Sequence, residues 1–267
     1  MKKRIIYIVS YFFTLLLLFV IQKPLFMLYN DAVGKEVSVN DFWQVMWHGV
    51  SLDATTAGYL TALPLLVILV SIWIRKISLK KLLLPYYILV AILVSVVFVV
   101  DMGLYPFWGF KLDASIFLYL DSPKEAMASV SAGFIAIRIL AMIAWVAGMV
   151  WLMLKITPRI LEKVEKRAWG TLGGLLLGGV LFVIIRGGVT ESTSNVGQVY
   201  FSSNQFLNHS AVNPCFSLLS SMGKSKDFSS EFNFFEEEKR AELFEGLYPK
   251  GNVDKNIEVL NTKRPNV

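Results

Sequence analysis

Long apolar stretches alternate with shorter polar segments along most of the chain. Five of these stretches are close to the ~20 residues that an α-helix needs to cross ~30 Å of hydrocarbon. Because lipid offers no partner to backbone amides, each stretch is predicted to be helical throughout. The predicted spans are Ile5–Leu25, Thr55–Ile74, Leu82–Leu104, Ala132–Leu154 and Ala168–Ile185. This pattern predicts an all-α membrane protein with five transmembrane helices.

The polar segments differ in charge according to the side of the membrane on which they would lie. Basic clusters precede the first span and fill the links after the second and fourth spans. Cytoplasmic loops retain the excess of lysine and arginine. The N-terminus is therefore predicted to be cytoplasmic and, after five crossings, the C-terminal tail extracytoplasmic. The net charge of +6 gathers at these membrane boundaries, which argues against a nucleic-acid partner.

Hydrophobic residues make up 55% of the chain, but the excess stops near Arg186. This change predicts a five-helix membrane domain over residues 1–187, a juxtamembrane extracytoplasmic segment over 188–250 and an extended linker over 251–267. Short amphipathic helices are predicted at the membrane surface over 41–50 and 229–247, the first capped from Ser38 onward. Another short helix is predicted to begin at 122–123.

The fifth predicted span carries Gly170, Gly174 and Gly178 at four-residue spacing. Small residues at this spacing give a helix a smooth face that a second helix can approach closely. Tight packing within the bundle is the favoured interpretation. A homo-oligomer that uses this face is the alternative.

Charged residues within predicted spans are costly, so each one suggests a functional site. Asp101 and Arg138 lie at similar depths near the extracytoplasmic side, where they could pair with each other or flank a lipid phosphate. Asp53 and Arg186 lie at span boundaries, where access to water makes a charge less costly. The residues predicted to bind lipid or substrate are Asp53, Asp101, Trp108, Lys111, Arg138 and Arg186.

Motifs of the common hydrolases, metalloenzymes and nucleotide-binding proteins do not occur in the sequence. The only cysteine, Cys215, excludes an internal disulfide and is interpreted as a small buried residue. His48 and His209 cannot alone supply the usual zinc ligands. No catalytic residue, metal ligand or cofactor is predicted within this chain.

Several segments together resemble the membrane half of the lipoteichoic acid synthase-like phosphoglycerol transferases, of the alkaline phosphatase/sulfatase superfamily. The similarity covers nearly the whole chain, and the segment from Asn204 to Leu218 is the most specific; it resembles the form seen in Bacteroidetes members. The segments that carry it are Trp47–Asp53, Trp108–Asp113, Tyr119–Leu120, Ser122–Ala126, Arg186–Gly188, Tyr200–Ser202 and Asn204–Leu218.

The resemblance implies a location in the bacterial cytoplasmic membrane and an extracytoplasmic catalytic domain after the linker. In the family that domain binds a divalent metal, commonly manganese, and transfers phosphoglycerol from phosphatidylglycerol. Its nucleophile and metal ligands are not in this sequence, so the chain is expected to be inactive alone. The implied function is a membrane anchor, with an anionic phospholipid and its own catalytic domain as partners. The alternative is a non-enzymatic polytopic membrane protein, such as a transporter subunit or an assembly partner.

Overall fold

The computed structural model describes residues 1–30, 37–74, 78–117, 131–159, 161, 164–223, 239 and 243. Over these residues the chain forms five long helices and three short ones, with the long helices each apolar and long enough to cross a membrane. The five predicted spans are thereby confirmed. The long helices are α1 (Lys2–Tyr29), α2 (Val39–Ser71), α3 (Leu79–Trp108), α6 (Ala132–Ile156) and α7 (Arg167–Arg186); the short ones are η1 (Val196–Val199), α8 (Gln205–Ala211) and α9 (Pro214–Met222).

The chain divides into a compact unit over residues 1–224 and a second over 225–267. The predicted helix over 229–247, the linker over 251–267 and the helix start at 122–123 lie outside the described ranges, apart from residues 239 and 243.

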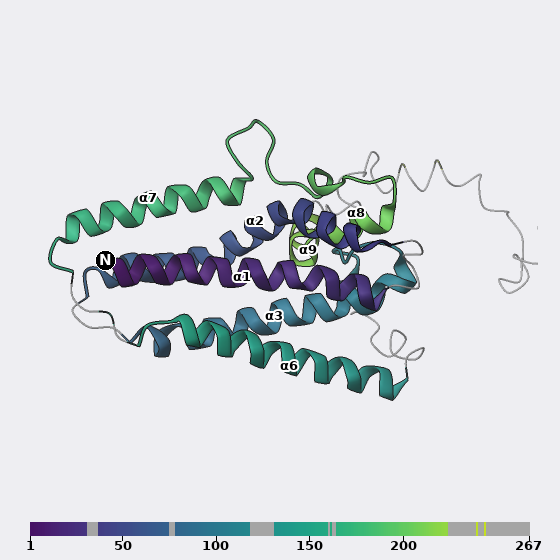
Figure 1. Ribbon diagram of the computed structural model, residues 1–267, viewed down its shortest axis with the longest axis horizontal. Coiled ribbons are helices and arrows are strands. Elements are labelled where there is room, and N and C mark those ends of the chain that lie inside the picture. Colours follow the sequence, from purple (N-terminus) through teal and green to yellow (C-terminus); the bar gives the residue numbers. More distant parts are fainter. Residues whose placement is uncertain are drawn as a thin grey trace, which may run out of the picture. The chain divides into compact units, whose positions relative to one another are not determined.

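In the first unit, α1 runs through the middle of the bundle, with α2 along one side and α3 nearby (Figure 1). The helix α6 packs mainly on α3, and α7 packs mainly on α2. We call the end that contains Met1, Lys80 and Arg167 the basic end. The opposite end, where α8 and α9 pack against the long helices, is the docking end.

The second long helix is longer than the sequence predicted. Ser38 caps it as expected, since its hydroxyl accepts a hydrogen bond from Asp41 N and the Asp41 side chain bonds back to Ser38 N. The prediction of a separate surface helix over 41–50 was wrong, because α2 continues without a break through Gly49 into the membrane span. Its 33 residues extend about 50 Å at 1.5 Å per residue, well beyond the ~30 Å of hydrocarbon.

Glycines set the contact between α7 and α2. A Cβ on Gly174 would overlap Leu69 of α2, and a Cβ on Gly178 would lie 3.7 Å from Leu65 Cδ2. On the other helix, a Cβ on Gly58 would lie only 2.7 Å from Ile185 Cγ1. The glycine face of α7 therefore packs within the same chain, as the favoured interpretation of its spacing expected.

At the basic end, buried polar groups join helices that are distant in sequence. Arg4 donates to Ser71 Oγ and Ser71 O, both at 3.0 Å, so its side chain satisfies a carbonyl at the end of α2. The hydroxyl of Tyr87 lies 2.6 Å from that of Tyr7 and 2.8 Å from that of Thr157. These contacts tie α1, α2, α3 and the end of α6 together.

At the docking end, aromatic side chains form a second core between the long helices and the short ones. The ring of Phe26 from α1 packs edge-on against Tyr105 from α3 at 4.9 Å, and Phe206 from α8 lies about 6 Å from both rings. The ends of α1, α2 and α3 at the docking end thus provide the surface against which α8 and α9 pack.

Candidate functional site

Two buried ion pairs lie at the docking end, beneath α8 and α9. Lys23 Nζ from α1 lies 2.5 Å from both carboxylate oxygens of Asp53 from α2. Lys111, which follows α3, donates to Asp101 of the same helix. All four side chains are buried, with Asp53 fully excluded from solvent. Two cations and two anions thus form a cluster with no net charge.

The second ion pair forms because the chain reverses after α3. Gly109 ends that helix in the left-handed conformation, at φ 70°, which glycine adopts without strain. The next residues turn back, so Lys111 reaches Asp101, and Leu112 N donates to Asp101 Oδ1 at 2.9 Å. The ammonium also lies 3.8 Å from the centre of the Phe26 ring. Asp101 is therefore satisfied by its own downstream segment.

Asn213 joins the first ion pair to the short helices. Its side-chain amide donates to Asp53 Oδ1 at 2.9 Å. Its carbonyl oxygen accepts from Cys215 N at 3.0 Å and Phe216 N at 3.2 Å, and so caps the N-terminus of α9. One side chain thus fixes the start of α9 to a buried carboxylate of α2.

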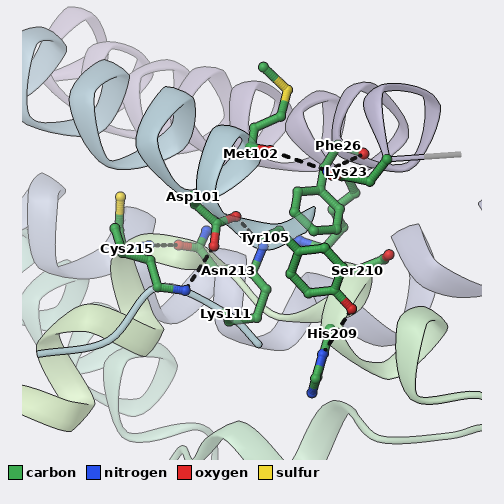
Figure 2. Close-up of polar contacts among 12 residues, drawn as sticks. Lys23, Phe26, Asp101, Met102, Tyr105, Lys111, His209, Ser210, Asn213 and Cys215 are labelled. Carbon is green, nitrogen blue, oxygen red and sulfur yellow. Dashed lines mark hydrogen bonds and ion pairs between the residues drawn. The ribbon is translucent and has the colours of Figure 1, made fainter. Parts of the chain in front are cut away.

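His209 and Cys215 complete the buried region that Figure 2 shows. The Tyr105 hydroxyl lies 3.0 Å from His209 Nδ1, which links α3 to α8. Burial lowers the pKa of His209, so the imidazole is neutral at neutral pH. Burial raises the pKa of Cys215 to about 12, which keeps its thiol protonated and unreactive. Both residues fit the interior of a docked segment.

The structure brings together three of the six residues predicted to bind lipid or substrate: Asp53, Asp101 and Lys111. Asp53 was expected at a wet boundary, but it is buried because Lys23 and Asn213 compensate its charge. The alternative in which Asp101 pairs with Arg138 is wrong, because the Asp101 carboxylate is paired with Lys111. That these three residues bind lipid remains a prediction.

The other three lie elsewhere. The indole of Trp108 stacks on Phe110, with ring centres 5.3 Å apart. Arg138 contacts the Tyr29 hydroxyl and donates to Phe134 O at 3.1 Å, and Arg186 donates to two carbonyls of the loop that follows α7. Within the described ranges, neither arginine forms an ion pair with a carboxylate.

Sequence reasoning missed Lys23 and Asn213. A signal for Lys23 existed: a lysine at the predicted extracytoplasmic end of a span runs against the charge rule and calls for a local anion. For Asn213, the following proline marked a helix start, but nothing local indicated which carboxylate its amide would meet.

Two concave sites flank α9. A pocket of about 330 Å³ lies on one side, lined by Phe110, Lys111, Asp113, Val196, Tyr200, His209, Ser217, Ser220 and Ser221. A groove of about 750 Å³ lies on the other side, between α9, α2 and the end of α7. Among the residues that the structure describes, no group of three or more His, Cys, Asp or Glu side chains could hold a metal ion.

Comparison with family models, curated proteins and solved structures finds no match to this chain. The resemblance to phosphoglycerol transferases therefore stays a prediction. The fold and the geometry of the docking end carry the functional argument.

Proposed function

We propose that this polytopic membrane protein is an anchor that fixes residues 196–223 on the extracytoplasmic end of its helix bundle. The observation that carries the proposal is the bond from Asn213, the cap of α9, to Asp53 within a buried ion pair. A segment held only by surface contacts would need no such cluster. The polypeptide that follows α9 would then start from a fixed point near the outer lipid headgroups.

The charge distribution supports the proposed orientation. The described lysines and arginines of the basic end have no comparable set of acids beside them, whereas Lys23 and Lys111 at the docking end are each paired. Retention of basic segments in the cytoplasm would place the docking end outside. We place the chain in a bacterial cytoplasmic membrane, with a cytoplasmic N-terminus and an extracytoplasmic C-terminus.

The resemblance supplies the enzyme that such an anchor would serve. A phosphoglycerol transferase-like or sulfatase-like domain, with a divalent metal such as manganese, would act on lipid headgroups at the outer face. Tethering replaces a three-dimensional search by a local one and keeps the reacting groups near each other. The coding sequence after Val267 separates this reading from the non-enzymatic alternative, since a metal-binding acid and a threonine nucleophile are expected there.

The buried cysteine provides a direct test of docking. Wild-type Cys215 is expected to resist a membrane-impermeant maleimide, because its thiol is buried and protonated. Replacing Asn213 by alanine removes the cap of α9 and one of the hydrogen bonds that Asp53 accepts, a loss of about 2–4 kcal/mol together. Labelling of Cys215, measured by mass shift in intact membranes, should then become at least about tenfold faster.

Asn204→Ala is the matched control for this test. Asn204 caps α8 in the same segment through Phe206 N, but within the described residues none of its hydrogen bonds reaches a long helix. It should therefore accelerate labelling less than Asn213→Ala. Fast labelling of the wild type, or equal rates in the wild type and Asn213→Ala, would contradict the proposed docking.

A further inference from the structure

The groove beside α9 is formed by four segments: the middle of α2, the last turns of α7, the loop over 187–195 and α9. Its volume of about 750 Å³ lies within the range of ligand-binding clefts, ~300–1,000 Å³. The lining residues are Thr56, Tyr59, Phe182, Ile185, Arg186, Thr193, Ser194, Phe216, Leu219 and Ser220. None of the charges of the buried cluster lines it.

One part of the groove is apolar and open to the lipid-facing surface. Tyr59 of α2 is 54% exposed, Phe182 of α7 65% and Leu219 of α9 57%. Phe182 lies one turn before the end of α7, a helix long and apolar enough to cross a membrane. In a bilayer this wall would lie beside the acyl chains, close to the headgroups. A membrane lipid would already lie against this apolar wall, which favours a lipid over a soluble ligand.

The other part of the groove carries polar groups whose hydrogen-bonding capacity is unused. Arg186 Nη1 donates to Gly188 O at 3.2 Å and Thr190 O at 2.6 Å. Its Nε and Nη2 carry three more N–H groups, and these find no acceptor among the described residues. Over the same residues, the hydroxyls of Thr193 and Ser220 make no hydrogen bond.

The loop that forms the polar wall is held in place. Ser194 N donates to Arg186 O at 2.9 Å, and the Ser194 hydroxyl lies 2.9 Å from that of Thr55 on α2. Gly187 has φ 90°, and a Cβ there would overlap Ser194. The loop thus folds back tightly over the end of α7, which keeps the arginine beside the groove before any ligand arrives.

We propose that this groove binds one phospholipid with an anionic headgroup. The phosphate accepts hydrogen bonds from Arg186, Thr193 and Ser220, and an acyl chain lies along Tyr59, Phe182 and Ile185. A guanidinium matches a phosphate through two parallel N–H groups, and among the described residues no carboxylate forms an ion pair with Arg186. The inference rests on the proposed function, because it assigns a specific position to the lipid that the anchor would hold.

Arg138 offers a contrast within the same end of the bundle. It too lacks an acidic partner over the described ranges, but it lies 3.0 Å over the Phe134 ring and lines neither concave site. Its Nε is buried against α3, where a Cβ on Gly103 would lie 3.1 Å away. Replacing either arginine by glutamine removes one positive charge, but only Arg186 lies in the groove. Arg138→Gln is therefore the matched control.

The experiment measures binding of phosphatidylglycerol to the purified full chain in neutral detergent micelles, by native mass spectrometry. The wild type should retain one phosphatidylglycerol in preference to phosphatidylcholine. Arg186→Gln should weaken this binding roughly tenfold, because hydrogen bonds to a charged group are lost. Ser220→Trp, which fills the groove and keeps the charge, should weaken it as well, whereas Arg138→Gln should not. Glycerol phosphate without acyl chains should not compete.

Shielding of Cys215 from maleimide serves as the check that each variant keeps α9 docked. The proposal is overturned if Arg186→Gln and Ser220→Trp bind phosphatidylglycerol like the wild type while Cys215 stays shielded. It is also overturned if Arg138→Gln alone abolishes binding, or if free glycerol phosphate competes as well as the lipid. None of these results would contradict the anchor role. A separate result, rapid maleimide labelling of Cys215 in the wild type, is the one that would contradict it.

Discussion

At the scale of single residues, the docking end contains two kinds of cation: those paired with a carboxylate and those without a carboxylate partner among the described residues. Lys23 and Lys111 are buried, and each has a carboxylate partner, whereas Arg138 and Arg186 have none among the described residues. Desolvation of a charge is costly, so these buried ion pairs are weak evidence of net stabilisation, although loss of one partner would be strongly destabilising. Arg186, which lines the groove, is the arginine with hydrogen-bonding capacity left for an external anion.

The pair of Lys111 and Asp101 should behave as a coupled unit. Lys111→Met alone leaves Asp101 buried with one bond, from Leu112 N, and should lower the free energy of unfolding by about 3–5 kcal/mol. The double variant Lys111→Met/Asp101→Leu removes both charges and should recover much of that loss. Unfolding by denaturant in micelles measures the coupling. A double variant as unstable as the sum of the two single variants would contradict it.

At the scale of elements, the sequence predicted what hydrophobic length determines and missed what tertiary contacts determine. The five spans, the Ser38 cap and the fit of α7 through its glycines follow from local patterns. The unbroken α2 does not, because its polar segment around Gly49 remains helical by packing against Lys23 and Ala211. The pair of Lys111 and Asp101 was also hidden, since it depends on the reversal of the chain at Gly109.

The contact between α7 and α2 can be tested with adjacent glycines. Gly174→Leu would collide with Leu69 and should destabilise the bundle by about 1–3 kcal/mol. Gly173→Leu is the matched control, because a Cβ there meets nothing within 4 Å. Thermal unfolding and the oligomeric state should be measured together. If Gly174→Leu instead dissociates a dimer without loss of monomer stability, the homo-oligomer alternative is correct.

At the scale of the whole molecule, the anchor role depends on which end of the bundle faces the cytoplasm. The structure places Ser78, the N-cap of α3, at the basic end, and Val189 beyond α7 at the other; both are exposed, Val189 by 84%. With Cys215 replaced by serine, a single cysteine at either position reports its side of the membrane. The charge rule predicts a cytoplasmic position 78 and an extracytoplasmic position 189.

Labelling of intact cells by a membrane-impermeant maleimide should therefore modify the Val189→Cys variant, and should modify Ser78→Cys only after the membrane is opened. Both positions are exposed, so a difference in labelling reflects the side of the membrane and not burial. The reverse pattern would put Asn213, the groove and everything after α9 in the cytoplasm. A tether for chemistry on outer headgroups would then be excluded, even though every contact of the docking end would be unchanged.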